Sequence, residues 1–325
     1  MKEREIVFMF AGQGSQYYHM GALLYERYPV FRGWLNYFDE LSVKIMGESV
    51  LSELFSGHKK IGDSFQNLRY THPAIFMFQF AFAKLVNSYG IYPAKVLGSS
   101  LGEFVAAALS GVCDEETAFK LVVNQSFILE SHCSEGRMLI VIAEDEMAKD
   151  GRIFGDTEVV ALNKNHFIVA GSIDRINQLK DRLAYESVQS MVLPIDYAFH
   201  SQHIERAKEF YTSYLNGISF NVPDIRFFSS CKGRELSFIT PSFFWDVIRD
   251  PIFFIPSVCS LESSASHIYI DLSPSGSLVA MVHSCLPKHS PSECYSLWNV
   301  AKRIDVFSEQ LENLAVDLLK RRGGR

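Results

Sequence analysis

A serine between two glycines, Gly98-x-Ser100-x-Gly102, is the strongest chemical signal in the chain. It follows the apolar run Ala94–Leu97 and precedes the helix-like run Phe104–Leu109, so we expect a strand before it and a helix after it. Small neighbours let the backbone turn sharply enough to expose the hydroxyl above a sheet, and the helix N-terminus favours a developing oxyanion. The pattern predicts that Ser100 is the nucleophile of a covalent mechanism.

A serine nucleophile needs a general base, and the sequence offers ten histidines. His200 is the candidate because the segment Ala198–Ser201 lies where a strand-rich insert is expected to end and the chain to rejoin the main sheet. His203, one helical turn later, is its main competitor. His72 precedes Pro73 and is interpreted as a residue that begins a helix.

A glycine-rich turn, Gly12–Gln16, follows the first apolar run, Ile6–Phe10. It lacks the Lys-Ser/Thr pair of a P-loop and the spacing of a dinucleotide fingerprint, which argues against nucleotide binding. A better use of such a turn is to bring backbone N–H groups toward the catalytic serine, where they would stabilise an oxyanion. A plain tight turn is the alternative.

The elements that must position these residues show two different hydrophobic patterns. Helical patterns cover Met20–Ser56, a segment from Thr71 or Pro73 to Ser88, and Asp114–Glu130, whereas His267–Asp271 is a further core strand. Between residues 131 and 197 the pattern changes to strands that end in a β-β-α-β order, with Ile173–Tyr185 as the helix between the last two strands. The four expected strands are Met138–Ile142, Val159–Leu162, Phe167–Ala170 and Ser190–Leu193. We therefore expect a small α+β subdomain at 131–197, inserted into a larger α/β subdomain formed by 1–130 and 198–325.

The composition excludes several classes of protein. The chain has 325 residues, 48% of them hydrophobic, and its net charge of −6 gives no support to a nucleic-acid or anionic-membrane partner. The most apolar stretch, Ala74–Val86, is too short to span a bilayer. The six cysteines are scattered without metal-ligand spacing, so we expect reduced thiols, no metal site and a soluble cytoplasmic protein.

Five motifs occur in an order and spacing that resemble the malonyl-CoA:acyl carrier protein acyltransferase family, including the free-standing acyltransferases of polyketide synthases. The motifs are Phe10-Ala-Gly-Gln-Gly-Ser-Gln16, Thr71-His-Pro-Ala74, Gly98-Ser-Ser-Leu-Gly-Glu103, Tyr197-Ala-Phe-His-Ser201 and Asp271-Leu-Ser-Pro-Ser-Gly276. The resemblance covers roughly residues 5 to 285. It implies an α/β hydrolase-like subdomain with a ferredoxin-like insert, a Ser100–His200 dyad, and an oxyanion hole formed by the backbone N–H groups of Gln13 and Leu101. It implies no cofactor.

Two positions depart from the family pattern. Ser99 stands where members usually have a histidine before the nucleophile. Gln125, followed by Ser126, stands where malonyl-handling members carry an arginine that binds the free carboxylate of the malonyl group. Loss of one partner of such a desolvated pair costs about 2–5 kcal/mol, or roughly thirty- to several-thousandfold in specificity. The alternative is that another cation compensates, and Arg137, just before the first strand of the insert, is a candidate.

These departures favour a trans-acting acyl hydrolase of a polyketide synthase pathway, which removes stalled acetyl and longer acyl groups from carrier-protein thioesters as a proofreading step. The expected partner is an acyl carrier protein with a phosphopantetheine-bound acyl chain, with acyl-CoA as a further acyl source, and the expected state is a monomer. Besides Gln125, we expect Ser99, Phe199 and Asn163 to contact the substrate. The alternatives are an acyltransferase that loads carrier proteins from malonyl-CoA or another acyl-CoA, and, more remotely, an inactive scaffold that binds a carrier protein.

Overall fold

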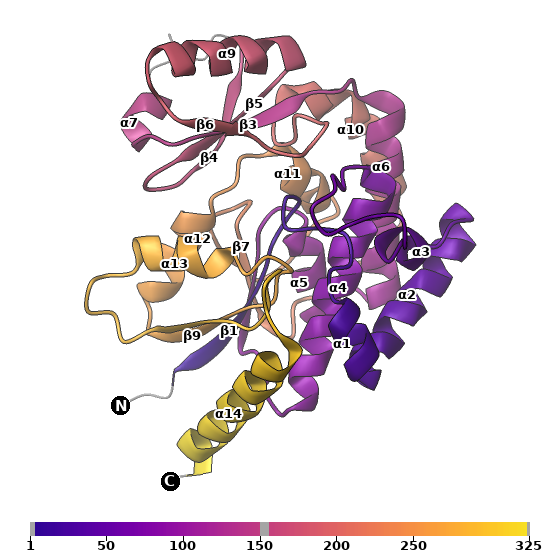
Figure 1. Ribbon diagram of the computed structural model, residues 1–325, viewed down its shortest axis with the longest axis vertical. Helices are drawn as coiled ribbons and strands as arrows, with labels where there is room; N and C mark the ends of the chain where they lie inside the picture. The colour runs from indigo at the N-terminus through magenta and orange to yellow at the C-terminus, as the bar shows by residue number, and fades with distance from the viewer. Residues whose placement is uncertain (1–3, 150–155, 324–325) are drawn as a thin grey trace.

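A six-stranded sheet forms the centre of the larger subdomain (Figure 1). The computed structural model describes residues 4–149 and 156–323. The strand order is β10-β9-β1-β2-β7-β8, and neighbouring strands are parallel except β7 and β8. The strands are β1 (Glu5–Phe10), β2 (Lys95–Gly98), β7 (Arg226–Ser229), β8 (Arg234–Leu236), β9 (His267–Asp271) and β10 (Glu293–Ser296).

Helices cover both faces of this sheet, which explains why its central strand β1 is a nearly continuous apolar run. Along β1, Phe8 and Phe10 contact one hydrophobic cluster, whereas Val7 and Met9 contact another. The first cluster includes α4 (Leu68–Ser88), α5 (Gly102–Leu109) and α6 (Glu115–His132); the second includes α12 (Phe254–Glu262) and α13 (Leu278–Cys285). The remaining helices of this subdomain are α1 (Ala22–Arg27), α2 (Pro29–Met46), α3 (Val50–Leu54), the 3-10 helix η1 (Gln202–Ala207), α10 (Lys208–Leu215), α11 (Phe243–Arg249) and α14 (Ile304–Gly323).

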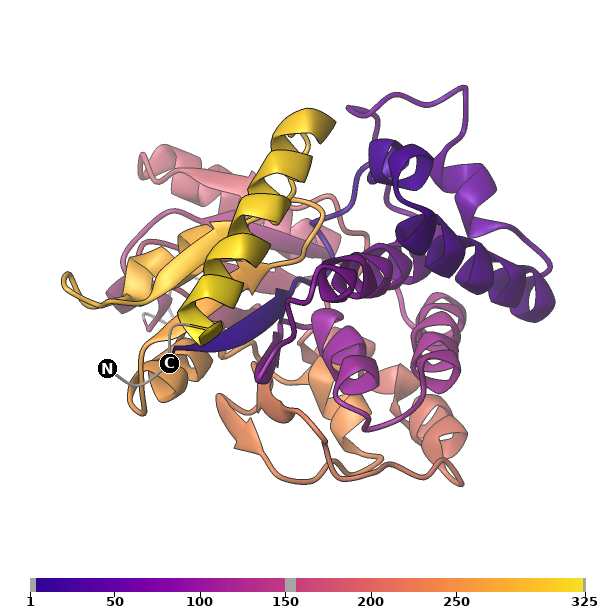
Figure 2. The same cartoon turned by 90° about the horizontal axis from the view of Figure 1, so that it is seen from below.

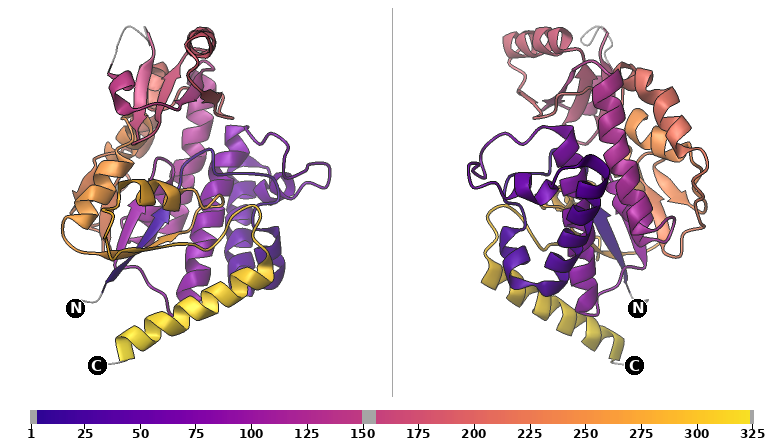
Figure 3. Two further views of the ribbon diagram at one scale, coloured as in Figure 1. Left: turned by 60° about the vertical axis from the view of Figure 1, so that its left-hand side comes forward. Right: turned by 90° about the vertical axis from the view of Figure 1, so that its right-hand side faces the viewer.

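The second sheet has four antiparallel strands in the order β4-β5-β3-β6. With the strands numbered along the chain, this is the 4-1-3-2 order of a ferredoxin-like fold when it is read from β6. Its elements are β3 (Arg137–Val141), α7 (Asp145–Ala148), β4 (Glu158–Leu162), β5 (Phe167–Gly171), α9 (Ile173–Tyr185) and β6 (Ser190–Val192). In both views of Figure 3 this sheet and α9 lie at one end of the molecule and α14 at the other; Figure 2 shows α14 crossing beneath the central sheet.

Alternation along β3 gives the small sheet two different faces. Leu139 and Val141 pack under α9 with Ile176 and Leu183. Met138, one position away, packs with the larger subdomain instead. One face of the small sheet is therefore covered by its own helix, and the other is turned toward the central sheet and its loops.

The sequence-based α/β class with a ferredoxin-like insert is confirmed, and several boundaries differ from the expectation. The pattern over Met20–Ser56 forms three helices rather than one, with left-handed glycines at Gly21 and Gly47. Helix α4 begins before Pro73 because the side chain of Asn67 accepts a hydrogen bond from Arg69 N and caps an earlier turn. Strands β7, β8 and β10 were not expected. No helix within the described ranges is long and apolar enough to cross a membrane.

Candidate active site

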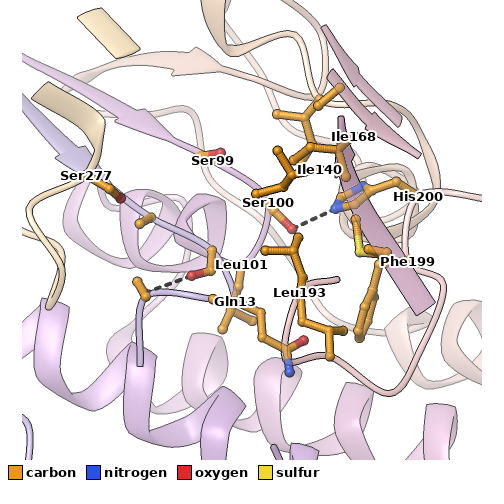
Figure 4. Close-up of a pocket in the computed structure, with 18 of the residues that line it drawn as sticks. Gln13, Ser99, Ser100, Leu101, Ile140, Ile168, Leu193, Phe199, His200 and Ser277 are labelled. Atoms are coloured by element: carbon orange, nitrogen blue, oxygen red, sulfur yellow. Dashed lines mark hydrogen bonds between the residues drawn. The ribbon is translucent and has the colours of Figure 1, made fainter. Parts of the chain in front are cut away.

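The hydroxyl of Ser100 meets the imidazole of His200 at the carboxyl ends of β1 and β2 (Figure 4). The distance from Ser100 Oγ to His200 Nε2 is 2.8 Å. Ser100 lies two residues after the end of β2, and its φ of 51° places it in the left-handed region. Hydrogen bonds from Gly102 N to Ser99 O and from Glu103 N to Ser100 O close the turn and begin α5. The expected strand–serine–helix arrangement is therefore present in the structure.

Both glycines of the motif are required by close backbone approaches. A β-carbon on Gly102 would lie 2.1 Å from Phe10 O, and one on Gly98 would lie 2.4 Å from the Cα of Glu103. Neither contact is possible for a real side chain, because backbone atoms cannot move aside as a flexible side chain does. The glycines let β1, β2 and the start of α5 come together beneath Ser100.

His200 is held by two backbone carbonyls. Its own N–H donates to Ile248 O at 2.9 Å, with φ at 62°, and its Nδ1 lies 2.8 Å from Asp250 O. A carbonyl oxygen only accepts, so Nδ1 carries the proton and Nε2 is left as the acceptor that faces Ser100. The carboxylate of Asp250 is itself bound to Lys232 Nζ at 2.9 Å. Asp250 therefore orients the imidazole of His200 through its backbone carbonyl, which no side-chain pattern would indicate.

The protonation state of His200 suits a general base. Burial lowers the pKa of its imidazole to about 4, and the nearby carbonyl and carboxylate of Asp250 oppose this shift only in part. The side chain is consequently neutral at neutral pH and able to accept the proton of Ser100. His203, the competing histidine, lies outside the cavity around Ser100, and its Nε2 is buried without a hydrogen-bond partner among the described residues.

The glycine-rich loop lies directly against Ser100. The side-chain amide of Gln79 anchors it, accepting from Ala11 N at 2.6 Å and donating to Ala11 O at 3.0 Å. A β-carbon on Gly12 would lie 2.9 Å from Ser100 Cβ and 3.4 Å from Leu101 N. Gln13, the next residue, also lines the cavity. The two backbone segments proposed for the oxyanion hole are thus brought together on one side of Ser100.

The dyad opens into a cavity of about 240 Å³ between the two subdomains. Its described wall holds neutral side chains, since burial lowers the pKa of His72 to about 3 and also lowers that of His166. The aliphatic part comes largely from the small sheet and the segment after it. The lining residues are Ala11, Gly12, Gln13, Gly14, Ser15, His72, Ser99, Ser100, Leu101, Gln125, Met138, Ile140, Ala161, Asn163, His166, Ile168, Leu193, Ile195, Phe199, His200, Ile252, Ser277, Leu278 and Met281.

Gln125 reaches this wall from α6. It is 2% exposed, and its Oε1 has no hydrogen-bond partner within the described part of the chain. Ser99, Phe199 and Asn163 line the same cavity, so the structure brings together all the residues expected to contact substrate. Arg137 does not line it: its register partner Gly171 faces Ile176 of α9, on the opposite side of the small sheet.

Sequence reasoning missed two histidines of the cavity. His72 lies inside α4 rather than at its start, and its Nε2 is 3.1 Å from Gln13 Oε1. His166 follows the turn between β4 and β5, with its Nε2 2.9 Å from Asn163 Nδ2. The Thr71-His-Pro-Ala74 motif was the available signal for His72, whereas only the sheet register places His166 at the cavity.

Glu103 supports the nucleophile turn from below. Its Oε1 accepts hydrogen bonds from Ser229 Oγ, Ser230 Oγ and Cys231 N at 2.9, 3.1 and 2.9 Å. Burial raises the pKa of this carboxyl to about 8, although the three donors act in the opposite direction. The side chain ties the first turn of α5 to the end of β7. Groups of three or more His, Cys, Asp and Glu side chains suited to a metal ion are absent from the described residues.

Comparison with known proteins gives consistent matches over nearly the whole chain. The model of the acyl transferase domain family matches residues 7–313. The polyketide biosynthesis acyltransferase homolog PksD of Bacillus subtilis (strain 168) is 37% identical over 311 residues, which are 95% of this chain and 94% of that protein. The homolog BaeD of Bacillus velezensis is 34% identical over 310 residues, which are 95% of this chain and 96% of that protein.

Two solved structures illustrate the likeness in fold. A loading acyltransferase from the avermectin modular polyketide synthase superposes with a TM-score of 0.86 at 24% identity, covering 95% of this chain and 99% of that one. A malonyl CoA-acyl carrier protein transacylase from Clostridium perfringens superposes with a TM-score of 0.80 at 20% identity, covering 98% of this chain and 100% of that one. Both share the two-subdomain architecture described above.

Proposed function

The chain belongs to the acyl transferase domain family, and from this premise we propose that it is a trans-acting acyl hydrolase that removes neutral acyl groups from the phosphopantetheine thioesters of acyl carrier proteins in polyketide biosynthesis. The observation that carries the proposal is the neutral side chain of Gln125 in the cavity around Ser100. A family member that loads malonyl units has to hold a free carboxylate, and burying that anion against a neutral wall is costly.

The proposed acylation step uses the dyad. Ser100 Oγ attacks the thioester carbonyl carbon while its proton passes to His200 Nε2. The backbone N–H groups of Gln13 and Leu101 stabilise the oxyanion of the tetrahedral intermediate. The carbon–sulfur bond then breaks, and the departing thiol of the phosphopantetheine arm takes the proton from His200. The products of this step are the acyl ester of Ser100 and the holo carrier protein.

Deacylation repeats the sequence with water. His200 Nε2 accepts a proton from a water molecule as its oxygen attacks the ester carbonyl carbon, and the same two N–H groups hold the second oxyanion. The bond to Ser100 Oγ breaks, Ser100 recovers its proton from His200, and a free carboxylic acid leaves. The net reaction is thioester plus water to carboxylic acid plus thiol, so no other reactant is needed.

The test compares two incubations by intact-mass analysis of the carrier protein. One begins with acetyl carrier protein, and the other with holo carrier protein and malonyl-CoA; Ser100→Ala is the control in both. The proposal predicts conversion of acetyl to holo carrier protein with the wild type alone, and no malonylation in the second incubation. Malonylation there would identify an extender-unit transferase. No Ser100-dependent change in either incubation would favour the scaffold.

A further inference from the structure

We propose that an apolar groove on the exposed part of the small sheet continues the catalytic cavity and binds the distal part of long, aliphatic acyl chains. The groove is lined by Ile140, Ile142, His166, Gln189, Ser190 and Met191. This inference rests on the proposed function, because it assigns the length and polarity of the acyl group that the Ser100–His200 site receives. It adds a binding subsite outside the cavity that contains the dyad.

The groove and the cavity are parts of one surface. Ile140 and His166 line both. In the sheet register, Ile140 pairs with Ile168 on one side and with Met191 on the other. Residues paired directly across strands point to the same face, so these three side chains form one row that starts inside the cavity and ends in the groove. Figure 4 shows Ile140 and Ile168 beside the Ser100–His200 pair.

The outer end of this row is an unusual place for apolar side chains. Met191 is 57% exposed and Ile142 is 49% exposed, both on the face of the small sheet that α9 does not cover. Single exposed apolar residues are normal, but these two border the same groove and join the aliphatic wall of a cavity that holds a nucleophile. The arrangement gives an acyl chain a continuous apolar path from Ser100 to the surface.

The chemistry of the lining favours an acyl chain over the other parts of the substrate. None of the described residues that line the groove carries a formal charge at neutral pH, and three of them are aliphatic. The phosphates of coenzyme A need charged partners, which these residues do not supply, since the other three, His166, Gln189 and Ser190, offer only neutral polar groups. A hydrocarbon chain needs only removal from water, and each buried methylene contributes about 0.8 kcal/mol.

The geometry also sets a length requirement. Ile168 and Met191 are separated by two strand spacings, or about 10 Å. An acetyl group bound to Ser100 stays within the cavity, whereas a chain of a dozen carbons has to leave it and lie along the row toward Met191. Substitutions at the outer end should consequently affect long chains and leave acetyl unaffected.

The experiment measures single-turnover acylation of the full-length enzyme by carrier protein loaded with acetyl, octanoyl or dodecanoyl groups. Rates come from the intact mass of the enzyme, and the release of free acid is followed in parallel. The variants are Met191→Asp and Ile142→Asp, with Met191→Leu as the conservative rescue. Leu162→Asp is the matched control: Leu162 is 42% exposed on the same sheet, but its register partner Phe167 packs under α9.

We expect Met191→Asp and Ile142→Asp to lower the acylation rate constant for the dodecanoyl substrate about tenfold, which corresponds to one or two methylenes that no longer leave water. Acetyl transfer to Ser100 should change less than twofold, and Met191→Leu and Leu162→Asp should behave as the wild type. An equal decrease of the acylation rate constant for acetyl and dodecanoyl, or no decrease for either, would overturn the proposal that the groove binds long acyl chains.

The two proposals fail in different ways. Formation of the acyl enzyme is common to hydrolysis and transfer, so the chain-length effect is readable even if water is not the acceptor. A chain-length effect without release of free acid would retain the groove and reject the hydrolase. If free acid is released at the same rate in Met191→Asp, Ile142→Asp and the wild type, the hydrolase is retained and the groove is rejected. If the wild type forms no acyl enzyme with any acyl chain, both proposals are rejected.

Discussion

Ser100 and His200 both have left-handed backbone conformations, with φ of 51° and 62°, and their side chains meet at 2.8 Å. Non-glycine residues rarely adopt this conformation, and it is retained where the surrounding structure enforces it. At Ser100 the enforcing contacts are the glycine-mediated approaches of β1 and α5, and at His200 they are the bonds to the carbonyls of Ile248 and Asp250. Two separate sets of backbone contacts therefore fix the short distance between Ser100 Oγ and His200 Nε2.

The dyad should behave as a single catalytic unit. Ser100→Ala and His200→Ala should each lower kcat for hydrolysis of acetyl carrier protein by at least about a thousandfold, because each removes the same nucleophilic step. The double variant should be no slower than either single one. Steady-state release of holo carrier protein measures all three, and losses that multiply in the double variant would show that the two side chains act independently.

Gln125 should determine whether the cavity accepts a carboxylate. Gln125→Arg should allow acylation of Ser100 by malonyl-CoA and disfavour acetyl, a change in preference of roughly thirty- to several-thousandfold. Gln125→Met, which stays neutral and keeps a similar size, is the control and should not accept malonyl. Intact-mass competition between acetyl- and malonyl-CoA measures the ratio. A malonyl signal as strong in the wild type as in Gln125→Arg would contradict this assignment.

The pH profile should reflect the lowered pKa of His200. With that pKa near 4, kcat/KM should be flat from neutral pH down to about pH 5 and fall tenfold per unit below pH 4. A midpoint near the ordinary value of 6.5 would place the imidazole in a water-like environment instead. The profile is measured by stopped-time mass assays, with circular dichroism at each pH.

The contribution of the two buried histidines His72 and His200 to stability should also decline in acid, and its sign follows from the same burial. The folded protein holds His72 and His200 neutral down to about pH 3 and 4, whereas the unfolded chain protonates them below about 6.5. At these two sites the unfolded state thus binds more protons, whereas burial raises the pKa of Glu103 to about 8 and that of Asp271 to about 6, so these carboxyls act in the opposite direction. The contribution of the two histidines is complete above pH 6.5 and is lost as the pH falls below it, which urea titrations of the wild type and of His72→Gln across the window would measure.

The approach of Gly12 to the nucleophile predicts a selective defect. Gly12→Ala would place a methyl group 2.9 Å from Ser100 Cβ and should lower kcat more than it lowers stability, since the loop has to move away from the oxyanion position. Gly33→Ala, in α2 with open space around its Cα, should instead stabilise by about 1 kcal/mol through helix propensity and leave kcat unchanged. Parallel urea melts and deacylation rates compare the two, and a normal rate for Gly12→Ala would count against the loop's role.

The turn that carries Ser100 and the inserted subdomain were predictable because each depends on local pattern. Gly98 and Gly102 mark a turn that only glycine permits, and short apolar runs between residues 137 and 193 mark four strands. The choice of His200 over His203 needed the family resemblance, since both lie in the same short segment. Hydrogen bonds from His200 to the backbone carbonyls of Ile248 and Asp250, distant in sequence, make the difference in the folded chain.

Other features depend on long-range contacts that no single segment encodes. Strand β7 is only four residues long and pairs with β2 from about 130 positions away, so its pattern is too short to distinguish from a loop. The carbonyl of Asp250 acts through the backbone, and only the Asp250-Pro251 pair, which favours extended geometry, hints at its position. His166 reaches the cavity through the register of β5 against β3.

The most direct test of the hydrolase is the fate of the acyl enzyme. Acetyl-Ser100 enzyme is formed, separated from its donor and mixed with increasing concentrations of holo carrier protein, and its decay is followed by intact mass. The account predicts a decay rate that does not depend on holo carrier protein, with acetic acid as the product. A rate that rises in proportion to holo carrier protein, with acetyl carrier protein as the product, would contradict it and identify a transferase.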